Sequence, residues 1–249
     1  MTTFERFTQN LKEKTNNLYI KDIEQDPQSR IDPLSYYKET FVVIDGKTLN
    51  ANWVKMPEGT FIASQAPIVK TQCLFWKVCL EYSNLVVDLT CNFDSIDPYY
   101  PTARKTELSM DSLYISLIDQ KELIEGVYIQ DILIKDENNN LEKYIKRMHC
   151  QQWLDMQHFQ RVDELIKVSL KFMDESPPII HCRAGVGRTG TFITALCMYK
   201  LLIKEKNLSK EDRLKALEER IMLGRKQRSY LFVESLSQQE KLFHFTLNQ

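Results

Sequence analysis

Glycine is scarce in this chain, with 7 residues among 249, and neither a long apolar run nor an excess of basic charge is present. The longest apolar stretch, 192–203, is interrupted by Thr194 and Lys200 and is too short to span a bilayer. The first residues contain no apolar run that could form the core of a signal peptide. The 33 basic and 34 acidic residues give a net charge of −1, which disfavours a dedicated nucleic-acid binder. We therefore expect no membrane span and no nucleic-acid partner.

The cysteines lack the spacing of a metal site. There are 6 of them, and no two form a C-x-x-C pair, so the sequence predicts no zinc site. A chain of this length can build its core without disulfides. We expect reduced thiols, a cytoplasmic location and no metal.

The remaining pattern is that of an ordinary globular protein, with 43% hydrophobic and 27% charged residues and no repeat or linker. We predict one domain over 1–249. Apolar periodicity predicts helices at 2–14, 68–82, 158–174, 188–206, 210–223 and 234–245. Short apolar or alternating runs predict strands at 40–44, 51–55, 60–63, 85–89, 112–117, 127–135, 141–149 and 179–181. Strands and helices mix without strict βαβ alternation, so the expected fold is α/β, with a twisted mixed sheet flanked by helices.

Three of the glycines fall within six residues, at 185, 187 and 190. The surrounding sequence, 179–190, reads IIHCRAGVGRTG, in which a short apolar strand runs into a glycine-rich loop and the loop into a helix. Such a loop can point successive N–H groups inward, and the helix N-terminus adds its dipole. The sequence therefore predicts an anion site whose cradle is formed by Arg183, Ala184, Gly185, Val186 and Gly187.

The same loop contains the groups for nucleophilic attack on a phosphate ester. Thiols at helix N-termini beside cations have pKa values of roughly 3.5–7.5, so we expect Cys182 to be a thiolate at neutral pH. The planar guanidinium of Arg188 can bind two phosphoryl oxygens, and Thr189 can donate a hydrogen bond to the sulfur. A Walker A loop is excluded because no Gly-Lys-Ser/Thr follows at the required distance.

The loop 181–190 resembles the signature loop of the protein tyrosine phosphatases. Further landmarks of that family follow one another along 15–245: Asn17-Leu18-Tyr19 with Asp22-Ile23 and Ser29-Arg30-Ile31, Asn50 to Val54, Phe61 to Pro67, Phe75-Trp76, Leu89-Thr90, Tyr99 to Pro101, His149 to Asp155, Gly224 to Arg228, and Phe232 to Gln238. The resemblance covers nearly the whole chain and implies a single phosphatase catalytic domain.

The resemblance also implies roles for residues outside the loop. Asp155 would protonate the leaving tyrosyl oxygen and then act as a base on water. The family usually has Trp-Pro-Asp followed by Gly and Pro, whereas this chain has Leu154 before the aspartate and Met156-Gln157-His158 after it. His181 would orient the cysteine, and Gln238 would position the attacking water.

Four more residues are assigned in the same way. Tyr19 would stack on the substrate ring and set the depth of the pocket, and Asp22 would hold the substrate backbone. Glu234 stands where the family usually has another glutamine. Asp111 is the candidate to brace Arg188 with a salt bridge.

The predicted function is hydrolysis of phosphotyrosine in proteins through a phosphocysteine intermediate, by a monomer that needs no cofactor. Three alternatives stay open. A phosphoinositide phosphatase would use the extra charge of Arg183, but such enzymes usually have a lysine where Val186 stands. A dual-specificity phosphatase generally lacks the Tyr19 segment. A catalytically weak phosphotyrosine-binding pseudophosphatase is the third. The loop also resembles those of bacterial phosphatases injected into host cells, so a secreted effector is the alternative location.

Overall fold

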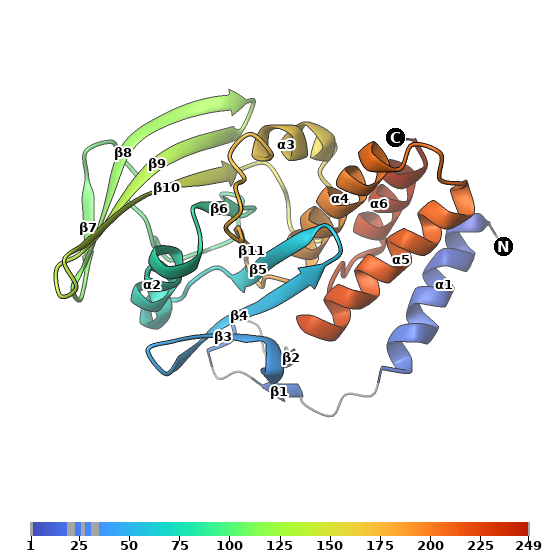
Figure 1. Cartoon of the computed structure of the whole chain (residues 1–249), viewed down its shortest axis with the longest axis horizontal. Coiled ribbons are helices and arrows are strands. Elements are labelled where there is room, and N and C mark those ends of the chain that lie inside the picture. Colours follow the sequence, from blue (N-terminus) through green and yellow to red (C-terminus); the bar gives the residue numbers. More distant parts are fainter. Residues whose placement is uncertain (1, 19–22, 26–27, 31–34, 249) are drawn as a thin grey trace.

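The computed structural model describes residues 2–18, 23–25, 28–30 and 35–248. Within these ranges the chain forms a nine-stranded mixed sheet with helices on both faces, together with a separate two-stranded sheet (Figure 1). This architecture confirms the predicted fold class. None of the helices in the described ranges combines the length and the apolar character that crossing a bilayer requires.

The large sheet has the strand order β3-β4-β5-β11-β6-β10-β9-β8-β7. Its strands are β3 (Phe41–Ile44), β4 (Lys47–Met56), β5 (Gly59–Gln65), β6 (Leu85–Asp88), β7 (Glu107–Met110), β8 (Leu113–Ile124), β9 (Val127–Asp136), β10 (Leu141–Cys150) and β11 (Ile179–Cys182). The four central strands β5, β11, β6 and β10 are parallel, and the outer pairs are antiparallel. β1 (Ile23–Gln25) and β2 (Ser35–Tyr37) form the small sheet.

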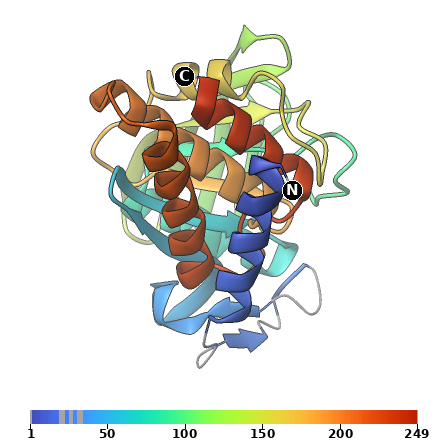
Figure 2. The ribbon, with the colours of Figure 1, turned by 90° about the vertical axis from the view of Figure 1, so that its right-hand side faces the viewer.

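The helices divide unevenly between the two faces. They are α1 (Thr3–Asn16), α2 (Gln72–Tyr82), α3 (Val162–Ser169), α4 (Gly187–Lys204), α5 (Lys210–Gln227) and α6 (Leu236–Asn248), with 3₁₀ turns η1 (Lys38–Thr40) and η2 (Val69–Thr71). α4 packs on β11 and contacts α3, α5 and α6, while α1 lies against α5 and α6 (Figure 2). α2 covers the other face, against β3 and β4.

Burial explains why β6 and β11 are the central strands. Every residue of Leu85–Asp88 and of Ile179–Cys182 is buried, as expected for parallel strands covered on both faces. Along β11, Ile179 packs in the core under α2, and Ile180 packs in the larger core under α4, α5 and α6. Cys182 therefore lies at the carboxyl end of a central strand, the edge at which open α/β sheets bind ligands.

Most predicted elements are confirmed, but the helix predicted at 158–174 is wrong at both ends. The helix observed there is α3, Val162–Ser169. Residues before it are used in other contacts: His158 bonds Ser237 and the carbonyl of Gln160 accepts from Lys241. After Ser169 the chain turns, with Lys171 N–H donating to the Val168 carbonyl. β1, β2 and β7 were not predicted, because three- or four-residue strands at sheet edges leave little periodic signal.

Candidate active site

Cys182 ends β11, and the loop after it closes around its sulfur. The Cys182 side chain is only 2% exposed. The N–H of Gly185 donates to Cys182 Sγ at 3.3 Å, and the N–H of Gly190 bonds the Val186 carbonyl to open α4. The structure therefore places the predicted nucleophile at the helix N-terminus, with backbone donors beside it. Of the cradle residues, Ala184, Val186 and Gly187 are buried, and Arg183 is exposed.

Gly185 is required by the shape of this loop. Its φ is +74°, and a Cβ there would lie 2.2 Å from the carbonyl oxygen of Ser64 on β5. A side chain would thus meet rigid backbone rather than a side chain that could move. The loop can pack this tightly against β5 only with glycine at this position.

Arg228 braces the loop from outside. Its guanidinium donates to Asn52 Oδ1 at 2.6 Å and Asn50 Oδ1 at 2.8 Å, so two alternate residues of β4 hold it. It also donates to the carbonyls of Ala184 and Gly185 at 3.2 and 3.1 Å. Because these carbonyls point toward Arg228, the loop has a fixed orientation.

Arg188 is fully buried and is held by Asp94 rather than by the predicted Asp111. Two hydrogen bonds of 2.6 and 2.9 Å join Arg188 Nη1 and Nη2 to the two oxygens of the Asp94 carboxylate. Burial alone would lower the pKa of Arg188, but Cys182, Asp94 and Asp155 around it raise the pKa above its ordinary value. Arg188 Nε has no hydrogen-bond partner among the described residues.

The prediction for Asp111 is wrong because of its place in the sheet. Asp111 lies in the turn between β7 and β8, at the far edge and several strands away from β11. It is exposed and adjoins Cys73. Asp94 follows β6 closely and could have been suspected for that reason, but Asp88 and Asp97 flank it and the sequence does not distinguish them.

The loop that contains Asp155 folds over the cysteine loop. Asp155 Oδ1 lies 3.1 Å from Arg188 Nη2, and Arg188 Nη1 donates to the Trp153 carbonyl at 2.9 Å. Trp153 is fully buried, and its Nε1 donates to the Gln157 carbonyl at 2.8 Å. The carboxylate therefore reaches the site although Leu154 replaces the family's proline.

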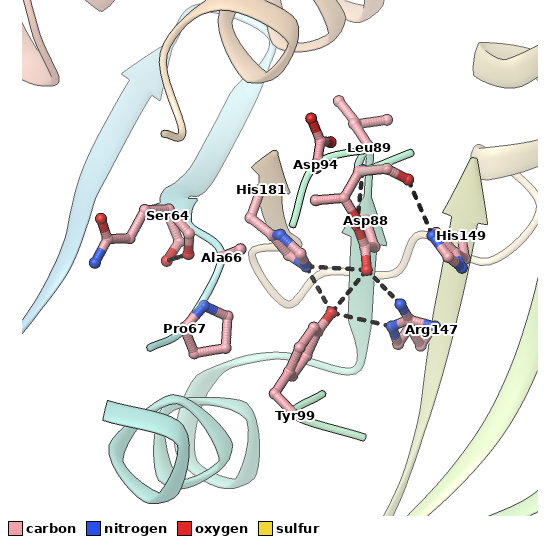
Figure 3. A network of polar contacts seen from close by, with 12 residues as sticks. Ser64, Ala66, Pro67, Asp88, Leu89, Asp94, Tyr99, Arg147, His149 and His181 are labelled. Atoms are coloured by element: carbon pink, nitrogen blue, oxygen red, sulfur yellow. Dashed lines mark hydrogen bonds and ion pairs between the residues drawn. The ribbon is translucent and has the colours of Figure 1, made fainter. Parts of the chain in front are cut away.

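A buried polar network lies beneath the cysteine loop, where His181, Asp88 and His149 are register partners on neighbouring strands (Figure 3). His181 Nε2 lies 2.7 Å from Tyr99 Oη, which donates to Asp88 Oδ2 at 2.9 Å. Arg147 is ion-paired with the same carboxylate and donates to Tyr99 Oη at 3.0 Å. His181 is thus fixed from behind, in agreement with an orienting role.

The charges of this network compensate one another. Burial alone would raise the pKa of Asp88, but His181 and Arg147 outweigh it and hold the pKa well below its usual range. Burial lowers the pKa of His181, and Asp88 opposes that shift. Burial also lowers the pKa of His149 to about 4. The Asp88–Arg147 pair, which sequence reasoning missed, depends on the register of β6 with β10.

Gln238 is buried beside the cysteine loop, so that a Cβ at Gly187 would lie 3.1 Å from its Nε2. Burial raises the pKa of Glu234, and the charge of Asp155 adds to the shift. The predicted bond from Thr189 to the sulfur is absent. The Thr189 hydroxyl is buried without a hydrogen-bond partner in the described part of the chain, and the donor to Cys182 is Gly185 instead.

Tyr19 and Asp22 lie outside the described residues, but the neighbouring segment 28–30 is fastened to the site. Arg30 donates to the carbonyls of Ala66 and Pro67 at 2.7 and 2.6 Å. Ala66 N–H in turn donates to the Cys182 carbonyl at 2.8 Å. The segment that resembles the family's phosphotyrosine loop is therefore joined to the cysteine loop through Ala66.

The other five cysteines are free thiols, and four of them are buried. Burial raises the pKa of Cys150 to about 12, and it also raises the pKa values of Cys79 and Cys197. It also raises the pKa of the half-buried Cys73, with Asp111 adding to the effect. Over the described ranges, no three His, Cys, Asp or Glu side chains are grouped so that they could hold a metal ion.

Known proteins match both the sequence and the fold. The family model for protein-tyrosine phosphatase matches residues 26–239, and the chain belongs to this family. It is 28% identical over 155 residues to tyrosine-protein phosphatase 2 of Schizosaccharomyces pombe, covering 58% of this chain and 22% of that protein. It is 30% identical over 187 residues to tyrosine-protein phosphatase 1 of Caenorhabditis elegans, covering 65% of this chain and 18% of that protein. The chain thus spans about a fifth of the length of these relatives.

Among solved structures, the chain resembles the catalytic domain of human protein tyrosine phosphatase non-receptor type 18. The TM-score is 0.84 at 18% identity, covering 98% of this chain and 95% of that one. The same phosphatase in complex with HER2 phosphopeptides gives a TM-score of 0.84 at 17% identity, covering 98% and 92%. The family predicted from the sequence is confirmed, and so is the fold.

Proposed function

We propose that residues 1–249 form a single catalytic domain that hydrolyses phosphotyrosine in proteins or peptides. The observation that best supports this function is the pair formed by Cys182 and Arg188. The sulfur accepts from a loop N–H, and a fully buried guanidinium beside it leaves Nε without a partner among the described residues. A buried donor in that position needs an acceptor, and a phosphoryl oxygen supplies one.

The first step forms a phosphocysteine. The Cys182 thiolate attacks phosphorus while the bond to the tyrosyl oxygen breaks, and Asp155 gives its proton to that oxygen. The loop N–H groups and Arg188 stabilise the charge on the three equatorial oxygens. Because these groups supply positive charge, the proposed reaction needs no metal or other cofactor.

The second step releases phosphate. Water attacks the phosphocysteine, its proton passes to the Asp155 carboxylate, and the S–P bond breaks to regenerate the thiolate. Gln238, buried beside Gly187, is placed to orient this water. Glu234 lies near Asp155, whose charge adds to the burial that raises the pKa of Glu234. Its carboxylate is therefore close to the group that takes the proton from water.

The substrate class and the setting belong to the same proposal. The type 18 phosphatase has been solved with phosphopeptides, and this chain shares its fold. The segment 28–30, which resembles part of the family's phosphotyrosine loop, is tied to the cysteine loop through Ala66, and this contact supports a phosphotyrosine substrate. We further propose a monomer in the cytoplasm, in keeping with the free thiols.

The test compares Cys182→Ser with wild type on a phosphotyrosine peptide, a phosphoserine peptide and an inositol-lipid headgroup. We expect turnover of the phosphotyrosine peptide alone, and its complete loss in Cys182→Ser with binding retained in calorimetry. Cys73→Ser is the matched control and should keep full activity. Binding without turnover by the wild type would identify a phosphotyrosine reader instead. Faster turnover of either other substrate would reassign the substrate class.

A further inference from the structure

The loop that contains Asp155 is anchored to two other parts of the fold. At the first anchor, Arg188 contacts the Trp153 carbonyl and the Asp155 carboxylate. The second anchor is the beginning of α6, where the next loop residues dock. Its residue Gln238 is the one proposed above to orient water, whereas Ser237 and Lys241 are not among the groups proposed to touch substrate.

Three residues near the start of α6 hold three residues of the loop. Ser237 Oγ accepts the backbone N–H of His158 at 3.3 Å and lies 2.8 Å from His158 Nδ1. Lys241 Nζ donates to the Gln160 carbonyl at 2.8 Å. Gln238 Nε2 approaches the Gln157 carbonyl at 3.5 Å. The Ser237–His158 contact is the only one of these that ties a loop residue down through both its backbone and its side chain.

Within the loop, Trp153 stacks on the buried Phe159 and donates to the Gln157 carbonyl, whereas the two residues that flank Asp155 are not buried. Met156, directly after Asp155, has a φ of +58°, a region that residues other than glycine seldom occupy. The side chains of Leu154 and Met156 are 40% and 47% exposed, so neither anchors the loop by burial. A strained backbone persists only when surrounding contacts impose it. The docking on α6 is such a contact, two residues after the strained position.

We propose that Ser237 and His158 are positioning residues, which hold Asp155 over Cys182 by fastening its loop to α6. The proposal rests on the proposed role of Asp155 as the general acid. Neither residue touches substrate, and each acts through the position of the carboxylate. A side chain on α6 thereby replaces the restraint that prolines in the loop would give.

The test uses Ser237→Ala and its conservative partner Ser237→Thr, which keeps the hydroxyl. Rates are measured on phenyl phosphate, whose leaving group needs a proton, and on 2,4-dinitrophenyl phosphate, whose leaving group does not. Ser237→Ala should lower kcat/KM for phenyl phosphate about three- to tenfold, the factor expected for one hydrogen bond. For 2,4-dinitrophenyl phosphate kcat/KM should stay within about twofold of wild type, because kcat/KM reports only the steps up to phosphocysteine formation and the leaving group needs no proton there.

Three controls complete the experiment. Ser237→Thr should restore the rate on phenyl phosphate, and His158→Ala should reproduce the defect. Glu240→Ala, at an exposed α6 residue whose carboxylate pairs only with His244 among the described residues, should behave as wild type. Equal losses on both substrates, or no loss in Ser237→Ala, would overturn the proposal.

Asp155→Ala separates this proposal from the proposed function. If Asp155→Ala shows the leaving-group dependence and Ser237→Ala does not, only the positioning role is wrong. If Asp155→Ala shows no such dependence, the general-acid assignment is wrong, and the positioning role falls with it.

Discussion

Asp94 holds the guanidinium of Arg188, which we propose to bind phosphate, so Asp94→Asn is the most informative substitution in the site. The wild-type carboxylate accepts bonds of 2.6 and 2.9 Å from the two terminal nitrogens of Arg188, and its side chain is 4% exposed. Asparagine has nearly the same shape but presents an amide donor in place of one oxygen. One of the two hydrogen bonds is lost, because the amide NH2 group of asparagine then faces a guanidinium N–H, and both are donors.

The expected effect follows from that single bond. A hydrogen bond to a charged group contributes about 1.5–3 kcal/mol, which corresponds to a loss of roughly 10- to 150-fold in kcat/KM. Larger losses are not expected, because Leu89 and Trp153 carbonyls still hold Arg188. Among the described residues Asp155 then remains as its carboxylate partner, and a tighter pair would draw the proposed acid away from the leaving group. Inhibition by inorganic phosphate should weaken in parallel.

The assay is turnover of a phosphotyrosine peptide, together with phosphate inhibition and a thermal melt. Asp111→Asn is the matched control, since Asp111 is exposed at the far edge of the sheet. It should leave kcat/KM within about twofold of wild type, as is usual for a surface change away from the site. A folded Asp94→Asn variant within threefold of wild type, or an equal defect in Asp111→Asn, would refute this account of Arg188.

Two further predictions concern the network below the loop. Asp88→Leu leaves the fully buried Arg147 without its carboxylate and should lower the free energy of unfolding by about 3–5 kcal/mol, whereas Asp88→Leu/Arg147→Met should regain most of it. Urea unfolding measures both, and a double variant no more stable than the single one contradicts the reasoning. The pKa of His149 is about 4 in the folded chain and about 6.5 in the unfolded chain. Between these pH values the imidazole is protonated in the unfolded state and not in the folded state, so a falling pH favours unfolding. The free energy of unfolding should therefore fall by up to about 3 kcal/mol from pH 6.5 to pH 4. In His149→Gln this contribution to the decrease should be absent. An unchanged pH dependence in that variant would show that another group is responsible.

Local sequence predicted the parts of the site that are contiguous in the chain. The strand, loop and helix over 179–190 follow from a buried apolar run, clustered glycines and an apolar helix, and all three are found. The bond from the Gly185 N–H to Cys182 Sγ lies within that loop and needs no distant residue. The Asp155 loop was assigned from its Trp153-x-Asp155 pattern, and the structure brings its carboxylate to Arg188.

Partners from distant strands could not be predicted in the same way. Asn50 and Asn52 meet Arg228 because β4 presents alternate residues to the same side, and their separation in sequence exceeds 170 residues. Asp88 meets Arg147 because β6 is parallel to β10, which the residues of either strand do not reveal. The same reason explains why Asp94, and not the predicted Asp111, pairs with Arg188. Which loops lie close together depends on the order of the strands that they connect.

The burial of the remaining thiols bears on how the protein can be studied chemically. Cys79, Cys150 and Cys197 have raised pKa values because they are buried, and Cys73 has one as well, so these four are poor nucleophiles near neutral pH. Cys182 lies before the N-terminus of α4, beside Arg188, and its sulfur accepts the N–H of Gly185. A small alkylating reagent used at low excess should therefore label the cysteine loop before these four thiols. In a Cys91→Ser variant, which removes the remaining thiol, that loop becomes the attachment point for a spectroscopic probe.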